Sequence, residues 1–257
     1  MNILHSKIIG SGKNHVIILH GLLGMGDNWK SIANKLSSEG YCVHLIDQRN
    51  HGKSFHSNEM NYDLMVEDIY SYLNFHDVGS CFLLGHSMGG KVAIKFSLLH
   101  SQYLKKLIIV DIAPKKYEPK FNYLFEALNT LDIENIKTRS EIEIALLDKI
   151  KEQSLVLFLL KNIGRNENNN FVFKANVNVL HQNLLTLMDK ITINENIFVH
   201  TTFIKGDKSD YINEIDAGLI KDKFPNSEII PIVNSGHWVH AENPDYFYSK
   251  LIEILKK

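Results

Sequence analysis

Residues 81–90 read CFLLGHSMGG, and the order of residue types predicts both a fold and a nucleophile. The apolar run 81–84 has the length and composition of a strand buried on both faces. Gly-His-Ser-Met-Gly follows directly, and residues 91–99 have helical character. A serine at such a sharp strand-to-helix turn has a strained backbone and an exposed hydroxyl, and small flanking glycines avoid collisions there. We therefore predict that Ser87 is a nucleophile.

Short apolar runs on both sides of this turn alternate with helical segments. This rhythm predicts a parallel sheet with right-handed crossovers. Pro231 lacks an N–H for the last strand, which should therefore lie at an edge of the sheet. The expected strands are 16–19, 42–46, 81–84, 107–110, 202–204 and 229–233, and the expected helices include 62–73, 212–223 and one that starts near residue 244.

The strand rhythm stops between residues 115 and 199, which read as several helices. Ser140 and Glu143 fit a capping box at the start of one of them. The asparagine-rich residues 166–170 indicate an exposed turn. We expect a core formed by residues 1–114 and 200–257, with residues 115–199 inserted as a helical cap.

Composition narrows the class of partner. The chain has 257 residues, 44% hydrophobic and 22% charged, with a formal net charge of −1. Nothing in this balance favours nucleic acid or an anionic membrane, and no apolar run is long enough to cross a bilayer. Cys42 and Cys81 lie in apolar runs and read as small buried side chains without a disulfide. Without a signal-peptide pattern, a cytoplasmic monomer or homodimer is expected.

An acyl-transfer nucleophile needs N–H donors for the developing oxyanion. One donor is expected from the residue after the serine, Met88. The other should come from the loop after an earlier neighbouring strand, which here reads HGLLG over residues 20–24. Gly21 would let the chain turn so that the Leu22 N–H faces the site. We predict an oxyanion hole formed by the backbone N–H groups of Leu22 and Met88.

The base should be a histidine late in the chain, and the position of His237 selects it among 13 histidines. His237 follows the run 229–233, so it should lie at the same sheet edge as Ser87. His240 is the alternative. The two have ligand-like spacing, but neither an HExxH motif nor clustered carboxylates accompany them. We expect neither a metal nor a cofactor.

Taken together, the motifs resemble those of α/β-hydrolase-fold enzymes. More narrowly, the chain is similar to the YbfF-type bacterial esterases, whose mammalian relative is the mitochondrial abhydrolase-domain protein 11. The resemblance covers nearly the whole chain except residues 115–199, where only the helical character is shared. The matching motifs are HGLLG (20–24) with Asn28-Trp29, Asp47-x-Arg49-x-x-Gly52-x-Ser54, Gly85-x-Ser87-x-Gly89-Gly90, Val-Asp-Ile-Ala-Pro (110–114) and Gly236-His237.

The resemblance implies a mostly parallel sheet of eight strands, with a helical cap inserted after the sixth. The sheet is expected to be slightly truncated here, because only residues 2–9 precede the run that starts at residue 16. It also implies an esterase that acts on small acyl esters, with acyl-CoA thioesters as a further substrate class.

The acid of the triad should come between serine and histidine in the chain. Most enzymes of this fold place it after the seventh strand, but there Ser209 occupies the acid's position and Asp210 comes one residue late. Asp111 ends the strand beside the nucleophile strand, where it can reach an imidazole, and the YbfF-type esterases resemble this arrangement. Asp111 is our choice. Two alternatives stay open: Asp210 could be the acid, and Asp111 could merely cap the turn that follows its strand.

The favoured function is a serine hydrolase that cleaves carboxylic esters through a Ser-His-Asp triad and an acyl-enzyme. The same triad also serves cofactor-free C–C hydrolases, lyases and haloperoxidase-like enzymes, and a slow-turnover ligand receptor is a further alternative. Apolar side chains from the cap and nearby loops should form the substrate pocket. They are Leu23, Leu124, Phe125, Leu128, Leu155, Phe158, Leu159 and Trp238.

Overall fold

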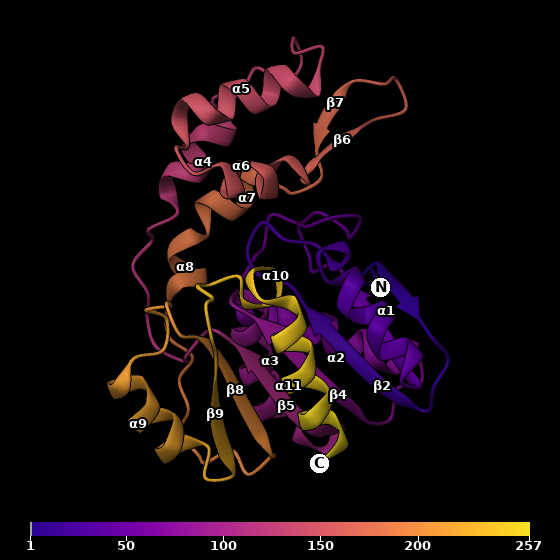
Figure 1. Ribbon diagram of the computed structural model, residues 1–257. Coiled ribbons are helices and arrows are strands. Elements are labelled where there is room, and N and C mark those ends of the chain that lie inside the picture. The colour runs from indigo at the N-terminus through magenta and orange to yellow at the C-terminus, as the bar shows by residue number, and fades with distance from the viewer. Residues whose placement is uncertain (1) are drawn as a thin grey trace.

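The main sheet is mostly parallel, and a computed structural model describes it together with the rest of residues 2–257 (Figure 1). Only the first strand in the order runs antiparallel to its neighbour. The predicted strands are confirmed, and the Pro231 strand lies at an edge as expected. The sheet has seven strands, in the spatial order β1 (Ser6–Ile9), β3 (Tyr41–Ile46), β2 (Asn14–Leu19), β4 (Cys81–His86), β5 (Leu104–Val110), β8 (Thr201–Gly206) and β9 (Ser227–Ile232).

Helices cover both faces of this sheet, which explains why its strands are apolar without alternation. Successive side chains of a strand point to opposite faces. In β2, Val16 and Ile18 belong to one core layer, while Ile17 and Leu19 belong to the other. The first layer packs under α1 (Lys30–Ser38) and α11 (Pro244–Lys256), and the second under α2 (Tyr62–Phe75), α3 (Met88–Leu99) and α9 (Glu214–Lys223).

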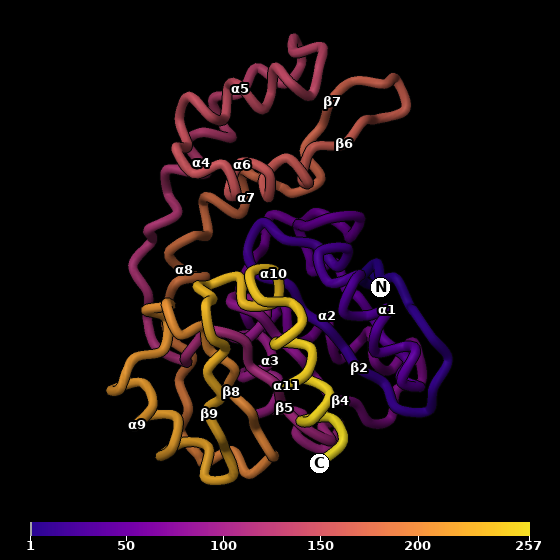
Figure 2. Tube along the Cα trace, viewed as in Figure 1, coloured from indigo at the N-terminus to yellow at the C-terminus, as the bar shows by residue number. Residues whose placement is uncertain are grey.

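The helices and the hairpin of residues 115–199, the inserted segment, lie beyond one end of the sheet, and the last residues of the segment run back beside α9, where the Ile197 N–H donates to the Lys223 oxygen (Figure 1). The chain enters this segment after β5 and returns from it just before β8, which Figure 2 traces. Its elements are α4 (Asn122–Asn129), α5 (Arg139–Lys149), α6 (Gln153–Leu160), β6 (Ile163–Arg165), β7 (Phe171–Phe173), α7 (Val177–Gln182) and α8 (Leu184–Met188).

Two details of the inserted segment differ from the sequence prediction. It contains a small antiparallel hairpin, β6–β7, whose three-residue strands are too short to show a period in sequence. The proposed capping box at Ser140 is wrong, because Thr138 caps α5 and accepts a hydrogen bond from the Glu141 N–H. Two Ser/Thr-x-x-Glu patterns overlap here, and the upstream one forms the cap.

Across residues 2–257, none of the helices combines the length and apolar character needed to span a bilayer.

Candidate active site

Ser87 lies at the turn between β4 and α3, with φ 53° and ψ −117°. A positive φ is strained for a residue with a side chain, and it persists because neighbouring segments fix the turn. A Cβ atom at Gly85 would lie 2.2 Å from the Gly89 carbonyl oxygen, and one at Gly89 only 2.5 Å from the Leu19 oxygen. The sharp strand-to-helix turn predicted from the glycines is therefore present.

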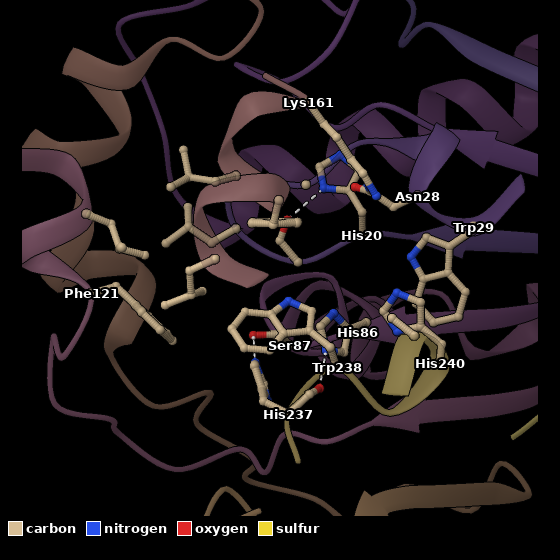
Figure 3. A pocket seen from close by; sticks show the side chains of 18 residues that line it. His20, Asn28, Trp29, His86, Ser87, Phe121, Lys161, His237, Trp238 and His240 are labelled. Atoms are coloured by element: carbon tan, nitrogen blue, oxygen red, sulfur yellow. Dashed lines mark hydrogen bonds between the residues drawn. The ribbon is translucent and has the colours of Figure 1, made fainter. Parts of the chain in front are cut away.

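His237 lies beside Ser87, as Figure 3 shows, with 3.0 Å between its Nε2 and the serine Oγ. It comes from the loop between β9 and α10 (Val239–Glu242). Two contacts hold it there. The His86 Nε2–H donates to the His237 carbonyl oxygen at 2.9 Å, and the Tyr211 ring stacks on the imidazole with 3.7 Å between centroids. The base chosen from sequence position is thus within hydrogen-bond reach of the nucleophile.

Asp111 follows β5 and is fully buried. Its Oδ2 lies 2.8 Å from Nδ1 of His237, and its Oδ1 accepts a hydrogen bond from the Gly206 N–H at 3.0 Å. Asp210 is exposed instead and pairs with Lys120 at 3.0 Å. The structure thus brings Asp111 and His237 together and leaves Asp210 outside the site.

His240, the alternative base, is buried and stacks on the Trp29 ring with 3.8 Å between centroids. Burial lowers its pKa to about 3, so it is neutral near pH 7. It contributes to the wall of the same cavity as Ser87, but the imidazole that contacts the Ser87 hydroxyl belongs to His237.

The loop after β2 approaches the serine closely. A Cβ atom at Gly21 would lie 3.2 Å from the Cβ of Ser87 and 3.0 Å from His86 Nδ1, so a larger residue would require its neighbours to shift by a few tenths of an ångström. His20 fixes this loop, since its Nε2 accepts from the Gln48 N–H at 3.0 Å and its Nδ1–H donates to the Gly21 oxygen at 2.8 Å. Leu22 and Met88 both line a small cavity beside Ser87. Their role as oxyanion donors stays a prediction.

A larger cavity of about 100 Å³ lies between Ser87 and the inserted segment. Of the eight side chains predicted to line it, five do so: Leu23, Leu124, Leu155, Phe158 and Trp238. Phe121 and Lys161, which were not predicted from the sequence, also line it (Figure 3). Neither belongs to a motif, and Phe121 lies just before α4, outside the helical pattern.

The other three predicted pocket residues, Phe125, Leu128 and Leu159, do not line this cavity. All three are fully buried within the packing of the inserted segment. Phe125 stacks on His181 of α7 with 5.2 Å between ring centroids. A helix of this segment presents only one of its apolar edges to the cavity, and the sequence pattern does not distinguish that edge from the one that packs inside.

Comparisons with known proteins agree on one class. Residues 14–244 match the family described as the alpha/beta hydrolase fold. A putative esterase/lipase of Haemophilus influenzae is 38% identical over 94% of this chain and 83% of its own length. Esterase YbfF of Escherichia coli is 30% identical over 90% of this chain and 88% of its own length.

Two further matches extend this comparison. The sn-1-specific diacylglycerol lipase ABHD11 of Danio rerio is 33% identical over 100% of this chain and 83% of its own length. The solved structure of a marine microorganism esterase superposes with a TM-score of 0.95 at 41% identity, covering 98% of this chain and 99% of that one.

Proposed function

We propose that this chain, which belongs to the α/β-hydrolase fold family, hydrolyses carboxylic esters through an acyl-enzyme on Ser87. Its class, a carboxylic ester hydrolase, follows from its esterase and lipase relatives. The residue roles are the proposal. The observation that carries them is the continuous chain of contacts from Ser87 Oγ through the two nitrogens of His237 to Asp111.

In the first step, His237 Nε2 takes the proton of the Ser87 hydroxyl as its oxygen attacks the acyl carbon. The backbone N–H groups of Leu22 and Met88 stabilise the negative charge on the acyl oxygen. The alcohol then leaves with the proton from His237, and the acyl group stays on Ser87. In the second step His237 removes a proton from water, whose oxygen attacks the acyl carbon. The bond between that carbon and Ser87 Oγ then breaks, the carboxylic acid leaves, and His237 returns the proton to Ser87 Oγ. Asp111 holds the imidazole tautomer and stabilises its protonated form.

The substrate is divided between two cavities that meet at Ser87. The larger is mainly lined by apolar side chains, including Leu155 and Phe158 of α6. The smaller, about 20 Å³, has room for about one or two water molecules. We expect the small part of the ester to occupy the smaller cavity and the long part to extend into the larger. The inserted segment acts in this proposal as a cap over the core, and the cytoplasm is the proposed compartment because both cysteines are free.

Hydrolysis of p-nitrophenyl esters of increasing acyl length tests the proposal, with an acyl-CoA thioester series beside it. Wild type should turn over esters, with an optimum in chain length set by the cavities. Ser87→Ala should lower the rate by about 10⁴- to 10⁶-fold, because triad members act as a unit. Ser97→Ala is the matched control, since Ser97 is a buried serine of the same helix whose hydroxyl donates to the Ile94 oxygen.

A fluorophosphonate probe identifies the nucleophile directly. It should label wild type and Ser97→Ala but not Ser87→Ala. Equal labelling of Ser87→Ala would contradict the assignment of the nucleophile. Covalent labelling of Ser87 without turnover of any ester would instead favour the slow-turnover receptor.

A further inference from the structure

A second cluster of reactive side chains lies at the opposite end of the sheet from Ser87. His15 is near the start of β2, and Cys42 is near the start of β3. These strands run parallel, and His15 and Cys42 are partners in their register. His44 follows two residues after Cys42, so its side chain is on the same face of β3. Ser87 follows the last residue of β4, so it lies at the opposite edge of the sheet.

The three side chains bring ligand atoms close together. The Nδ1 of His15 lies 2.9 Å from the Nε2 of His44, and the Cys42 Sγ lies 3.6 Å from the same nitrogen. One ligand atom from each of the three residues lies within 4.8 Å of the other two. Around a tetrahedral zinc ion, with Zn–N near 2.05 Å and Zn–S near 2.3 Å, ligand atoms are about 3.3 to 3.6 Å apart. The distances from His44 Nε2 to His15 Nδ1 and to Cys42 Sγ therefore need to change by only a few tenths of an ångström.

A chain of hydrogen bonds orients His44 through its other ring nitrogen, Nδ1. Its Nδ1 lies 2.8 Å from the hydroxyl of Tyr72, and this hydroxyl donates to the Ser6 Oγ at 2.6 Å. Since the tyrosine proton points to Ser6, the Nδ1 of His44 carries the hydrogen and donates it to Tyr72. The Nε2 lone pair then faces His15 and Cys42. Such a partner on the remote ring nitrogen is what metal-binding histidines have.

The surroundings also suit a cation site. Cys42 and His44 are 7% and 2% exposed, while His15 is only half-buried and leaves a route from solvent. The Cys42 thiol has to lose its proton when it binds a cation, because the thiolate is the ligand.

We propose that His15, Cys42 and His44 bind one late first-row divalent cation, with zinc as the natural class, and leave one coordination position for water. Thiolate and imidazole ligands select this class over magnesium or calcium. The sequence shows no sign of the site, because its ligands come from two strands and are not spaced as a motif. The competing arrangement is a direct hydrogen bond between the two imidazoles, with a free thiol beside it.

Titration of the metal-free protein with Co²⁺ separates these possibilities, because a cysteine thiolate on Co²⁺ gives a charge-transfer band in the near ultraviolet. We expect one Co²⁺ per chain, the charge-transfer band, visible bands of four-coordinate intensity, and displacement by Zn²⁺. Binding should release a proton from the thiol, measured in weakly buffered solution near neutral pH.

The two cysteines provide a matched pair of variants. Cys42→Ser should abolish the charge-transfer band and weaken Zn²⁺ binding by at least about tenfold, whereas Cys81→Ser should keep both. Tyr72→Phe keeps all three ligands but removes the partner of the His44 Nδ1–H, and it should weaken binding by about 10- to 100-fold. No band in wild type, or a band that survives in Cys42→Ser, would overturn the proposal. Thermal melts of each variant show that it is folded before binding is measured.

Discussion

The hydroxyl of Ser209 donates a hydrogen bond to Oδ2 of Asp111, the same oxygen that lies 2.8 Å from Nδ1 of His237. Ser209 occupies the place where most enzymes of this fold have their acid. In this chain the carboxylate beside the imidazole belongs to Asp111, which follows the neighbouring strand β5, and Ser209 supplies a hydrogen-bond donor to it. The Gly206 N–H, from the end of β8, donates to the other carboxylate oxygen.

From this arrangement we predict that Asp111→Asn loses activity and Asp210→Asn keeps it. An amide at position 111 cannot accept from Nδ1–H in the same way while holding its other partners, so the imidazole takes the wrong tautomer. We expect kcat to fall by up to about 10⁴-fold, the scale seen for a mis-set tautomer. Asp210→Asn should remain within about twofold of wild type, because its exposed ion pair with Lys120 adds little.

Steady-state kinetics with one p-nitrophenyl ester measures both variants, and thermal melts confirm folding. A folded, active Asp111→Asn together with an inactive Asp210→Asn would place the acid after β8 and refute our assignment.

For the two histidines of the site we predict opposite results. His237→Ala should lower kcat by about 10⁴-fold or more, because the base and the nucleophile act together. His240→Phe keeps an aromatic ring stacked on Trp29, and its kcat should stay within about tenfold of wild type. Because His240 lines the cavity, the larger effect of this variant should be on KM.

The pH dependence of kcat/KM gives an independent check. The pKa of His240 is lowered to about 3, so an enzyme with His240 as base would stay active down to about that pH. We expect activity to be lost well above pH 3 in wild type and in His240→Phe alike. If His240→Phe were as inactive as His237→Ala, the assignment of His237 as the base would have to be given up in favour of His240.

The sequence predicted the central strands well, because they are buried on both faces and so have apolar runs bounded by turns. β2, for example, has four consecutive residues with no exposed surface, from Val16 to Leu19. β1 was not among the predicted strands. It is short and lies at the edge of the sheet, where side chains that are half-buried or exposed give no clear pattern.

For the site, sequence position predicted that Ser87 and His237 lie close together, because strand ends of a parallel sheet share one edge, and they are 3.0 Å apart. The contacts that orient these two residues could not be predicted from the sequence. Tyr211 stacks on His237, and His86 donates to its carbonyl oxygen, yet both contacts join segments far apart in the chain. Likewise, the choice between Leu124 and Phe125 as cavity residues depends on how α4 is rotated, which its packing on α5 and α7 decides.

Buried histidines should make this protein sensitive to acid. In the folded state the pKa of His240 is lowered to about 3 by burial, against about 6.5 for an unperturbed histidine. Between these values the unfolded chain binds the extra proton and the folded protein does not. The free energy of unfolding therefore rises with pH across this window, and stability is lost as the pH falls from about 6.5 toward 3.

We predict that His240→Phe reduces this acid sensitivity. Each such histidine contributes up to about 1.4 kcal/mol per pH unit to the slope, so the variant should have a shallower slope by that amount. Urea unfolding between pH 6.5 and 4.5 measures it, and His200→Gln, which changes an exposed histidine, is the control. Parallel curves for wild type and His240→Phe would show that His240 is not held neutral in the folded state.

Lys91 should also make the free energy of unfolding rise with pH, but in a higher pH range than His240. It lies on α3 one turn after Ser87, and its buried ammonium donates to the carbonyl oxygens of Met188 at 3.1 Å and Asp189 at 2.6 Å, at the end of α8. Burial lowers its pKa to about 7, although the nearby Asp189 carboxylate acts in the opposite direction. An unperturbed lysine has a pKa of about 10.4.

Between about pH 7 and 10.4 the unfolded chain therefore binds a proton that the folded protein lacks, and the Lys91 contribution to stability increases with pH. We expect wild type to gain up to about 1.4 kcal/mol per pH unit relative to Lys91→Met across this window. The control is Lys95→Met, because Lys95 is on the same helix but pairs with the exposed Asp63. Urea unfolding at pH 7, 8, 9 and 10 measures all three proteins. If wild type and Lys91→Met change in parallel with pH, the ammonium of Lys91 keeps its proton in the folded state, and burial does not lower its pKa as inferred.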